Sequence, residues 1–231
     1  MSEASPKPRK RLLLPAAIGA VILALFIAAA WYWRSERFRD RVRAKVVSEL
    51  EQVTGGRVEL KSFDWNLSEL RLEARDLTIH GLEGPGEIPY AHVDRLLVRA
   101  KIISLLGREI GLRYVGIERP VIHLIVYPDG STNQPTPKVK QQSDRTPVER
   151  LFDLAINRLE LRSGQLLIND RKIPLDFNAN EVTAGATYDL LAKRYDGSLH
   201  IGKFDTKLEN FRPFASTAEV QFSLWPAAAE L

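Results

Sequence analysis

The chain of 231 residues contains no cysteine, and this absence removes several classes of chemistry at once. Disulfide scaffolds, zinc–thiolate sites and cysteine nucleophiles all require a thiol. The few histidines, His80, His92, His123 and His200, have no metal-ligand spacing with one another or with a carboxylate cluster. His123 lies inside an apolar segment, where we predict a buried and hydrogen-bonded core histidine.

Recognisable catalytic motifs are also missing. There is no nucleophile elbow, phosphate-binding loop or His-Glu-x-x-His helix in the sequence. Residues 129–133 lack the alternating oxygen ligands and the terminal glutamate of a calcium loop, so we predict a turn there. We therefore expect no catalytic residue, no metal site and no cofactor, and we do not expect an enzyme.

An excess of positive charge is found only at the start of the chain and is missing from the rest. The net charge is +4, yet residues 1–45 contain ten basic and three acidic side chains, so residues 46–231 carry a net charge of −3. A nucleic-acid-binding domain would carry its basic patch on the folded body. The observed distribution suits anionic lipid headgroups instead, and no nucleic-acid partner is expected.

The basic residues bracket an uncharged run that begins at Leu12 and ends at Trp33. Twenty-two helical residues span about 33 Å, which matches the hydrocarbon core of a bilayer. Trp31, Tyr32 and Trp33 form an aromatic belt at one end of the run. We predict a transmembrane anchor over residues 12–33, a cytoplasmic tail over residues 1–11 and an exported body, because long domains translocate largely regardless of charge.

A cleaved signal peptide is the alternative to an anchor. Ala28, Ala29 and Ala30 have the small-residue form of a cleavage site. The apolar run is longer than the usual signal-peptide core of about 7–15 residues, and the aromatic belt follows the alanines, so the anchor is favoured. The body is exported in both cases.

The exported body begins with a helical pattern and continues with strand patterns. Apolar residues at helical spacing and Gly55-Gly56 predict a helix over residues 35–54, lying near the headgroups or packed as an ordinary surface helix on the body. After it, apolar and charged residues alternate, as in Leu70 to Arg75, Arg95 to Ile102 and Arg158 to Arg162. This alternation predicts half-buried strands, about ten to twelve in all.

Several segments interrupt or end the strand pattern. We predict a first β-segment over residues 57–127, a polar, proline-rich loop over residues 128–147 and a second β-segment over residues 148–231. A capping box at Thr146 to Glu149 predicts a short helix ending near Asp153. Ser163-Gly164 and Asn169-Asp170 are predicted turns. The last strand, ending near Trp225, is expected to have a free edge that pairs with another element.

The ordered set of segments resembles the N-terminal part of AsmA-like proteins of the TamB type. The resemblance covers about residues 12–133 and rests on the following stretches in order: the anchor with its basic flanks, residues 54–58, residues 70–79, residues 93–106, residues 117–124 and residues 129–133. Residues 154–225 resemble further strand repeats, with less specific motifs. The family offers no catalytic residues to carry over.

The resemblance implies a mainly β fold: a transmembrane helix, a juxtamembrane helix, and a curled antiparallel β-groove with an apolar interior, in which a long loop and a short helix are inserted. It also implies an inner-membrane protein with a periplasmic body that acts in outer-membrane biogenesis. Such a protein would carry phospholipid or assist export together with an Omp85-type outer-membrane barrel protein. Well-known members are longer, so the chain is expected to form the entrance part of a groove or a piece of a longer protein.

The groove hypothesis assigns lipid-facing positions to one set of apolar residues in the alternating strands. An ordinary packed core is the competing interpretation of the same residues, and a scaffold that pairs with a partner strand through its free edge is the alternative function. The candidate lipid-facing residues are Leu96, Val98, Ala100, Ile122, Leu124, Val126, Leu159 and Leu161.

Overall fold

The computed structural model describes residues 35–104, 109–138, 152, 156–208 and 214–226. The chain divides into two compact units, residues 1–44 and 45–231, and the β-sheet belongs to the second. Within the described residues, no helix combines the length and the apolar character that crossing a membrane requires. The predicted anchor, with Leu12, Trp31, Tyr32 and Trp33, lies outside the residues that the structure describes.

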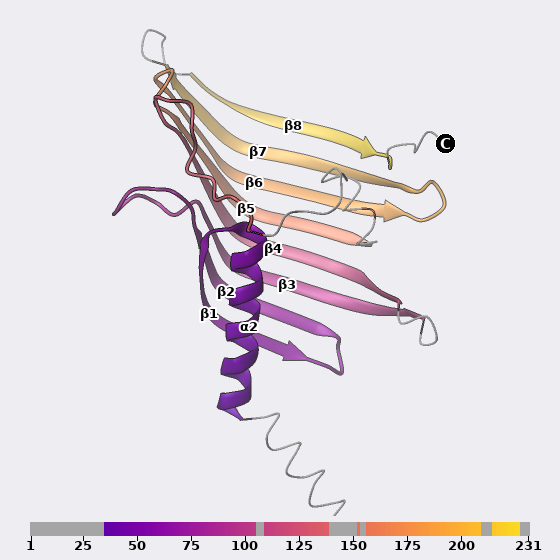
Figure 1. Cartoon of the computed structure of the whole chain (residues 1–231). Coiled ribbons are helices and arrows are strands. Elements are labelled where there is room, and N and C mark those ends of the chain that lie inside the picture. The colour runs from indigo at the N-terminus through magenta and orange to yellow at the C-terminus, as the bar shows by residue number, and fades with distance from the viewer. Residues whose placement is uncertain (1–34, 105–108, 139–151, 153–155, 209–213, 227–231) are drawn as a thin grey trace, which may run out of the picture. The chain divides into compact units, whose positions relative to one another are not determined.

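The second unit is built on one sheet of eight strands arranged in chain order (Figure 1). The sheet is not closed, and β1 and β8 form its two edges. Figure 1 shows the long strands curving along their length. The strands are β1 (Arg57–Asn66), β2 (Arg71–His80), β3 (Ala91–Ser104), β4 (Glu109–Val126), β5 (Arg158–Asp170), β6 (Leu175–Asp189), β7 (Arg194–Leu208) and β8 (Phe214–Leu224).

The mainly β fold class is confirmed, but two details of the prediction are wrong. The sheet is mixed, because β4 and β5 are parallel while every other neighbouring pair is antiparallel. A parallel pair needs a long crossover connection, and residues 127–157 supply it. The described residues also form eight strands rather than ten to twelve, because single strands of up to 18 residues replace pairs of shorter predicted ones.

The predicted first helix is confirmed as α2 (Glu36–Thr54). It ends at Gly55, whose φ of 82° is the left-handed conformation that commonly terminates helices. A side chain on Gly55 would also collide with the Thr136 carbonyl oxygen, 1.7 Å from the position of a Cβ atom. Of the predicted helix that ends near Asp153, the structure describes only Phe152.

A line of missing pairs crosses the sheet from edge to edge. In the register, Asp76 of β2 lies opposite Asp94 of β3, and Asp94 lies opposite Arg119 of β4, yet neither position forms a ladder pair. The pairing resumes on both sides with the same register in β2 and β3. The same interruption continues at Ser163 in β5 and Glu181 in β6. We call this line the crease.

The crease is made by residues in an unusual backbone conformation. Asp76, Arg119, Ser163 and Glu181 have φ values of 49°, 46°, 53° and 55°, in the left-handed region that non-glycine residues rarely occupy. Each sits in the middle of a strand, where it interrupts the extended conformation and reverses the alternation of side chains. The turn predicted at Ser163-Gly164 is therefore wrong, since β5 runs through it to Asp170. The turn predicted at Asn169-Asp170 lies just beyond these residues, because both still pair with β6 and the turn occupies residues 171–174.

The segment that follows β4 folds back and forms hydrogen bonds with the end of that strand. The Asn133 side chain is fully buried, accepts a hydrogen bond from the Ile125 N–H at 2.9 Å and donates one to the His123 carbonyl at 2.8 Å. Its backbone carbonyl accepts from the Leu82 N–H at 2.8 Å. The end of β4 extends past the start of β3, and Asn133 supplies the hydrogen-bond partners that β3 does not provide there.

Ser163 offers a test of the backbone strain at the crease. Replacing it by valine should lower the free energy of unfolding by about 1–2 kcal/mol, because a β-branched residue tolerates the left-handed region poorly. Ser163→Gly should be neutral or stabilising by up to about 1 kcal/mol. Urea unfolding measures both effects.

Ser198 is the matched control, since it is exposed, lies within β7 and has no positive φ. Ser198→Val should leave stability within about 0.5 kcal/mol of the parent. Equal losses for both valine variants would contradict strain at Ser163.

Candidate functional site

One face of the sheet carries an apolar row that runs through every strand. On β2 the row consists of Leu72 and Ala74, then Leu77 and Ile79 beyond the crease. On β3, Leu96 and Val98 fall in register with Ala74 and Leu72. We call this surface the apolar face. The face also comprises Ala100 on β3, Val115, Ile117, Ile122, Leu124 and Val126 on β4, Leu159, Leu161, Leu166 and Ile168 on β5, Phe177, Ala179, Val182 and Ala184 on β6, Leu199, Ile201 and Phe204 on β7, and Phe214, Ala218, Val220 and Phe222 on β8.

The face remains continuous across the crease because the alternation shifts by one residue there. Ala74 and Leu77, on opposite sides of Asp76, belong to one buried cluster together with Val58 and Leu60. Farther along the sheet, an apolar hollow of about 150 Å³ is lined by residues from both sides of the crease. Its lining includes Pro120, Ile122, Leu161, Gly164, Leu166 and Val182.

Much of the apolar face is incompletely covered by protein. Ile122 is 42% exposed, Val220 is 48% exposed and Phe214 is 56% exposed. Leu96, Val98, Leu159 and Leu161 are half-buried rather than buried. An exposed apolar surface of this extent marks a site for a partner, a ligand or a membrane.

Protein covers the apolar face at two margins only, among the residues that the structure describes. Near β1 and β2, Val46, Val47 and Leu50 of α2 pack against the cluster that contains Val58 and Leu60. Near the turn that connects β6 and β7, the Phe152 ring packs against two tyrosine rings. Its centroid lies 6.0 Å from that of Tyr188 and 5.0 Å from that of Tyr195. Tyr195 is fully buried as a result. The middle of the face lies between these covers.

The structure brings the eight candidate lipid-facing residues onto this one face. Leu96, Val98 and Ala100 lie on β3, and Leu159 and Leu161 lie on β5, all on the same side of the crease. The other three candidates, Ile122, Leu124 and Val126, lie on β4 beyond the crease. Their assignment to lipid remains a prediction.

Sequence reasoning missed the aromatic part of the apolar face. The Phe177, Phe204 and Phe214 rings form a chain, with centroids 5.8 and 6.1 Å apart. Phe222 lies over Gly197, where an added Cβ atom would come within 2.6 Å of the ring. The signal that could have found these residues is the alternation itself, once its phase is shifted at Glu181 and Gly202.

The opposite face of the sheet carries charged side chains, which are paired across the strands. Glu73 is only 6% exposed and accepts hydrogen bonds from Arg95 at 2.9 Å and Arg75 at 2.8 Å. Arg95 also pairs with Glu118 at 3.2 Å. The hydrogen bond from Arg95 is the main cause that lowers the pKa of Glu73 below its ordinary value. These residues link β2, β3 and β4.

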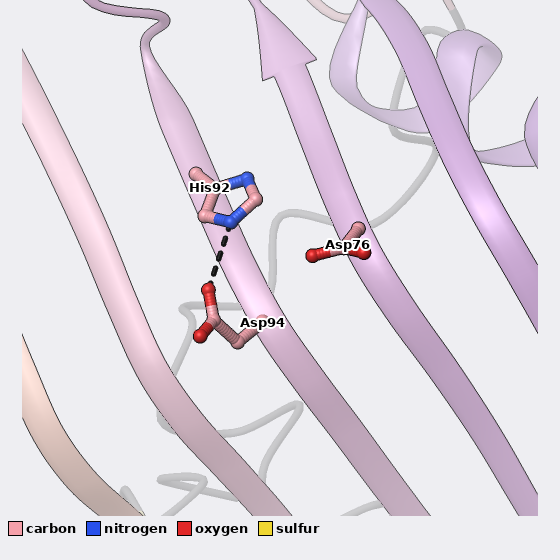
Figure 2. A group of neighbouring side chains, drawn as sticks. All are labelled: Asp76, His92 and Asp94. Carbon is pink, nitrogen blue, oxygen red and sulfur yellow. Dashed lines mark hydrogen bonds and ion pairs between the residues drawn. The ribbon is translucent and has the colours of Figure 1, made fainter.

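Charged side chains also gather along the crease, where Asp76, His92 and Asp94 form the group drawn in Figure 2. Their ligand atoms all lie within 4.8 Å of one another, and the His92 Nε2 atom lies 2.9 Å from Asp94. Lys61 pairs with Asp76 at 2.9 Å, and Arg119 pairs with Asp94. The Arg119 hydrogen bond lowers the pKa of Asp94 below its ordinary value. Both carboxylates already have cationic partners, so their negative charges are neutralised, and a metal ion would have to displace Lys61 and Arg119.

The prediction for His123 is confirmed. The side chain is 6% exposed, and its Nδ1 atom lies 3.2 Å from the Ile88 carbonyl oxygen. Its Nε2 atom pairs with the Asn169 side-chain oxygen. Both ring nitrogens are thus engaged in structural contacts.

No protein-family model matches the chain, and no curated protein matches it either.

The buried Glu73 should make stability fall in acid. Because its pKa is depressed in the folded state, its pairing stabilises the fold fully above the ordinary value of 4.5, and this contribution is lost as the pH falls through the folded-state pKa. Glu73→Gln should lower the free energy of unfolding at pH 7 by about 2 kcal/mol, since Arg95 and Arg75 lose their shared carboxylate. Urea unfolding from pH 7 to pH 3 measures this.

Glu219→Gln removes an exposed carboxylate from β8 and serves as the control, with an expected change within about 0.5 kcal/mol. The Glu73→Gln variant should also show a flatter loss of stability in acid than the parent protein. Parallel acid curves for parent and variant would refute the assigned role of Glu73.

Proposed function

We propose that the sheet is a trough that holds the acyl chains of phospholipid on its apolar face. The observation that carries this proposal is a row of apolar side chains that crosses eight strands. Most of its members between the two covers are half-buried, and Ile122 and Val220 are exposed. Transfer of each acyl CH₂ group from water onto such a surface is worth about 0.8 kcal/mol when the group is fully buried. An acyl chain on this face is therefore favoured over one exposed to water.

The crease supports a trough rather than a flat platform. The ladder of every neighbouring pair of strands is interrupted at the crease, and the strands curve together in Figure 1. The apolar hollow of about 150 Å³ lies on this line, and Ile122 and Leu161 contribute to its lining. Acyl chains that lie along the crease would contact successive strands in turn.

The wider setting follows from the resemblance to AsmA-like proteins and from the basic-flanked apolar run. In this proposal residues 12–33 anchor the protein in the inner membrane, with the aromatic belt of Trp31, Tyr32 and Trp33 at the interface. The N-terminus is cytoplasmic and the sheet is periplasmic. The protein then acts in outer-membrane biogenesis as the entrance part of a phospholipid-carrying groove, and an Omp85-type barrel protein is a candidate partner.

Charges placed on the apolar face test the proposal. Ile122→Glu and Val220→Glu add a carboxylate at side chains that are already 42% and 48% exposed, so the sheet should keep its fold. An unpaired carboxylate against acyl chains is strongly unfavourable, so binding of a fluorescent phospholipid should weaken at least about tenfold. Circular dichroism confirms that the variants stay folded.

Thr183→Glu provides the matched control, because Thr183 is exposed on the opposite face of β6. It should leave phospholipid binding within about twofold of the parent. Equal loss in all three variants, or no loss in any of them, would rule out the apolar face as the lipid site.

A second candidate function is a scaffold that pairs with a partner strand at β8. Only Glu219 is charged among the eleven residues of β8, whereas β1 carries Arg57, Glu59, Lys61 and Asp64 among its ten. Charged residues protect edge strands from pairing, so β8 is the less protected edge.

A photo-reactive side chain at Phe222 separates the two functions. The Phe222 position belongs to both the apolar face and the β8 edge. Lipid adducts, recovered by mass spectrometry from cells, would favour the trough. Protein adducts without lipid would favour the scaffold.

A further inference from the structure

A second hollow lies apart from the apolar hollow, and its lining is mostly polar. Its volume is about 630 Å³, within the range of small-ligand sites. It forms a notch between the turn that joins β1 to β2 and the protruding parts of β3 and β4. The lining residues are Ser68, Glu69, Leu70, Arg99, Ala100, Lys101 and Arg113.

The notch exists because β3 and β4 continue past the start of β2. The last ladder pair between β2 and β3 joins Arg71 to Arg99, and the Ala100 N–H then donates to the Leu70 carbonyl at 2.9 Å. Lys101 pairs only with Gly111 of β4 in the register. The edge of β3 is therefore open beside the β1–β2 turn.

A β-bulge places Arg113 at this notch. Arg99 pairs with Tyr114 in the register, but Ala100 pairs with Leu112, so Arg113 has no partner on β3. Bulges redirect side chains and are enriched beside functional sites. The Arg99 guanidinium carbon lies 6.0 Å from the centre of the Tyr114 ring, which holds this second cation beside the bulge.

The charges in the notch do not balance. Three cations, Arg99, Lys101 and Arg113, share the lining with one carboxylate, Glu69. Glu69 pairs instead with Arg71 at 3.5 Å, and Lys101 donates to the neutral Asn157 side chain. Among the described side chains, no carboxylate forms an ion pair with Arg99, Lys101 or Arg113. Elsewhere on the sheet, the arginines of the charged face and the crease are paired with carboxylates.

We infer that this notch binds an anion of the phosphate class. Two guanidinium groups offer planar pairs of N–H donors that match the oxygens of a phosphate, and Lys101 adds a third positive charge. The anion could be the phosphate of an anionic lipid headgroup or a free phosphate. Only the headgroup source rests on the proposed lipid trough: Ala100 ends the apolar row of β3 and also lines the notch, so acyl chains and headgroup could be held at adjoining places.

Binding of inorganic phosphate to the full chain, followed by ³¹P NMR, tests the site directly. The parent protein should bind phosphate, and the affinity should fall as ionic strength rises. Arg113→Gln should weaken binding about tenfold, the loss expected for one charge-assisted contact. Arg113→Lys keeps the positive charge but lacks the planar pair of N–H donors, so its phosphate affinity should lie between those of the parent and Arg113→Gln. Lys172→Gln removes one positive charge from the turn between β5 and β6, at the other end of the strands, and should leave the affinity unchanged.

A second arm uses short-chain phosphatidylglycerol and phosphatidylcholine to identify the source of the anion. Preference for phosphatidylglycerol that disappears in Arg113→Gln would support a headgroup site, even if free phosphate is bound too weakly to detect. Phosphate binding that depends on Arg113, with no binding of either lipid, would support a free-phosphate site and contradict the trough. Absence of both phosphate binding and lipid preference, or equal losses in Arg113→Gln and Lys172→Gln, would overturn the inference.

Discussion

A left-handed residue inside a strand interrupts the alternation of side chains, so one face of that strand stays apolar only if the apolar pattern of the sequence shifts by one residue there. The sequence makes this shift at the crease, where Ala74 and Leu77 flank Asp76 and belong to one buried cluster. Asp76, Arg119, Ser163 and Glu181 adopt left-handed backbone angles in four strands at aligned positions. Each such residue is unfavourable by about 1–2 kcal/mol, so the conformation persists only because the ladders on both sides hold it. The Lys61–Asp76 and Asp94–Arg119 pairs neutralise the charges that the bend brings together.

The consequence of the crease is an apolar surface larger than the chain covers with its own described residues. The helix residues Val46, Val47 and Leu50 cover the margin near β1, and Phe152 covers the margin near Tyr195. Between them most of the row is only half-buried, and Ile122 and Val220 are exposed. On the charged face, by contrast, Glu73 is buried beneath its arginine partners. The charged face is neutralised by its own ion pairs, whereas the apolar face is incompletely covered, and this difference is the physical basis of the proposed lipid trough. The cations beside Arg113, which have no carboxylate partner among the described side chains, add a place where the phosphate of a lipid headgroup would bind.

Local periodicity in the sequence predicts much of this architecture. The helix that ends at Gly55, the mainly β body and the shared face of Leu96, Val98, Leu159 and Leu161 follow from spacing alone. The crease does not, because Ser163-Gly164 reads as a turn when β5 is considered alone, and Asp76, Arg119 and Glu181 carry no local signal for a left-handed backbone. The left-handed residues are recognised as one line only when the register of the strands is known. The parallel pairing of β4 with β5 likewise depends on tertiary contacts and not on local periodicity. The notch at Arg113 depends on a bulge, for which the sequence carries no local signal.

Mass spectrometry of lipids that co-purify with the full chain under gentle extraction tests the central claim most directly. The trough account predicts phospholipid at a stoichiometric level in the parent protein and its loss in the folded Ile122→Glu variant. A folded parent protein that carries no phospholipid, or a variant that retains the same amount, would contradict the account.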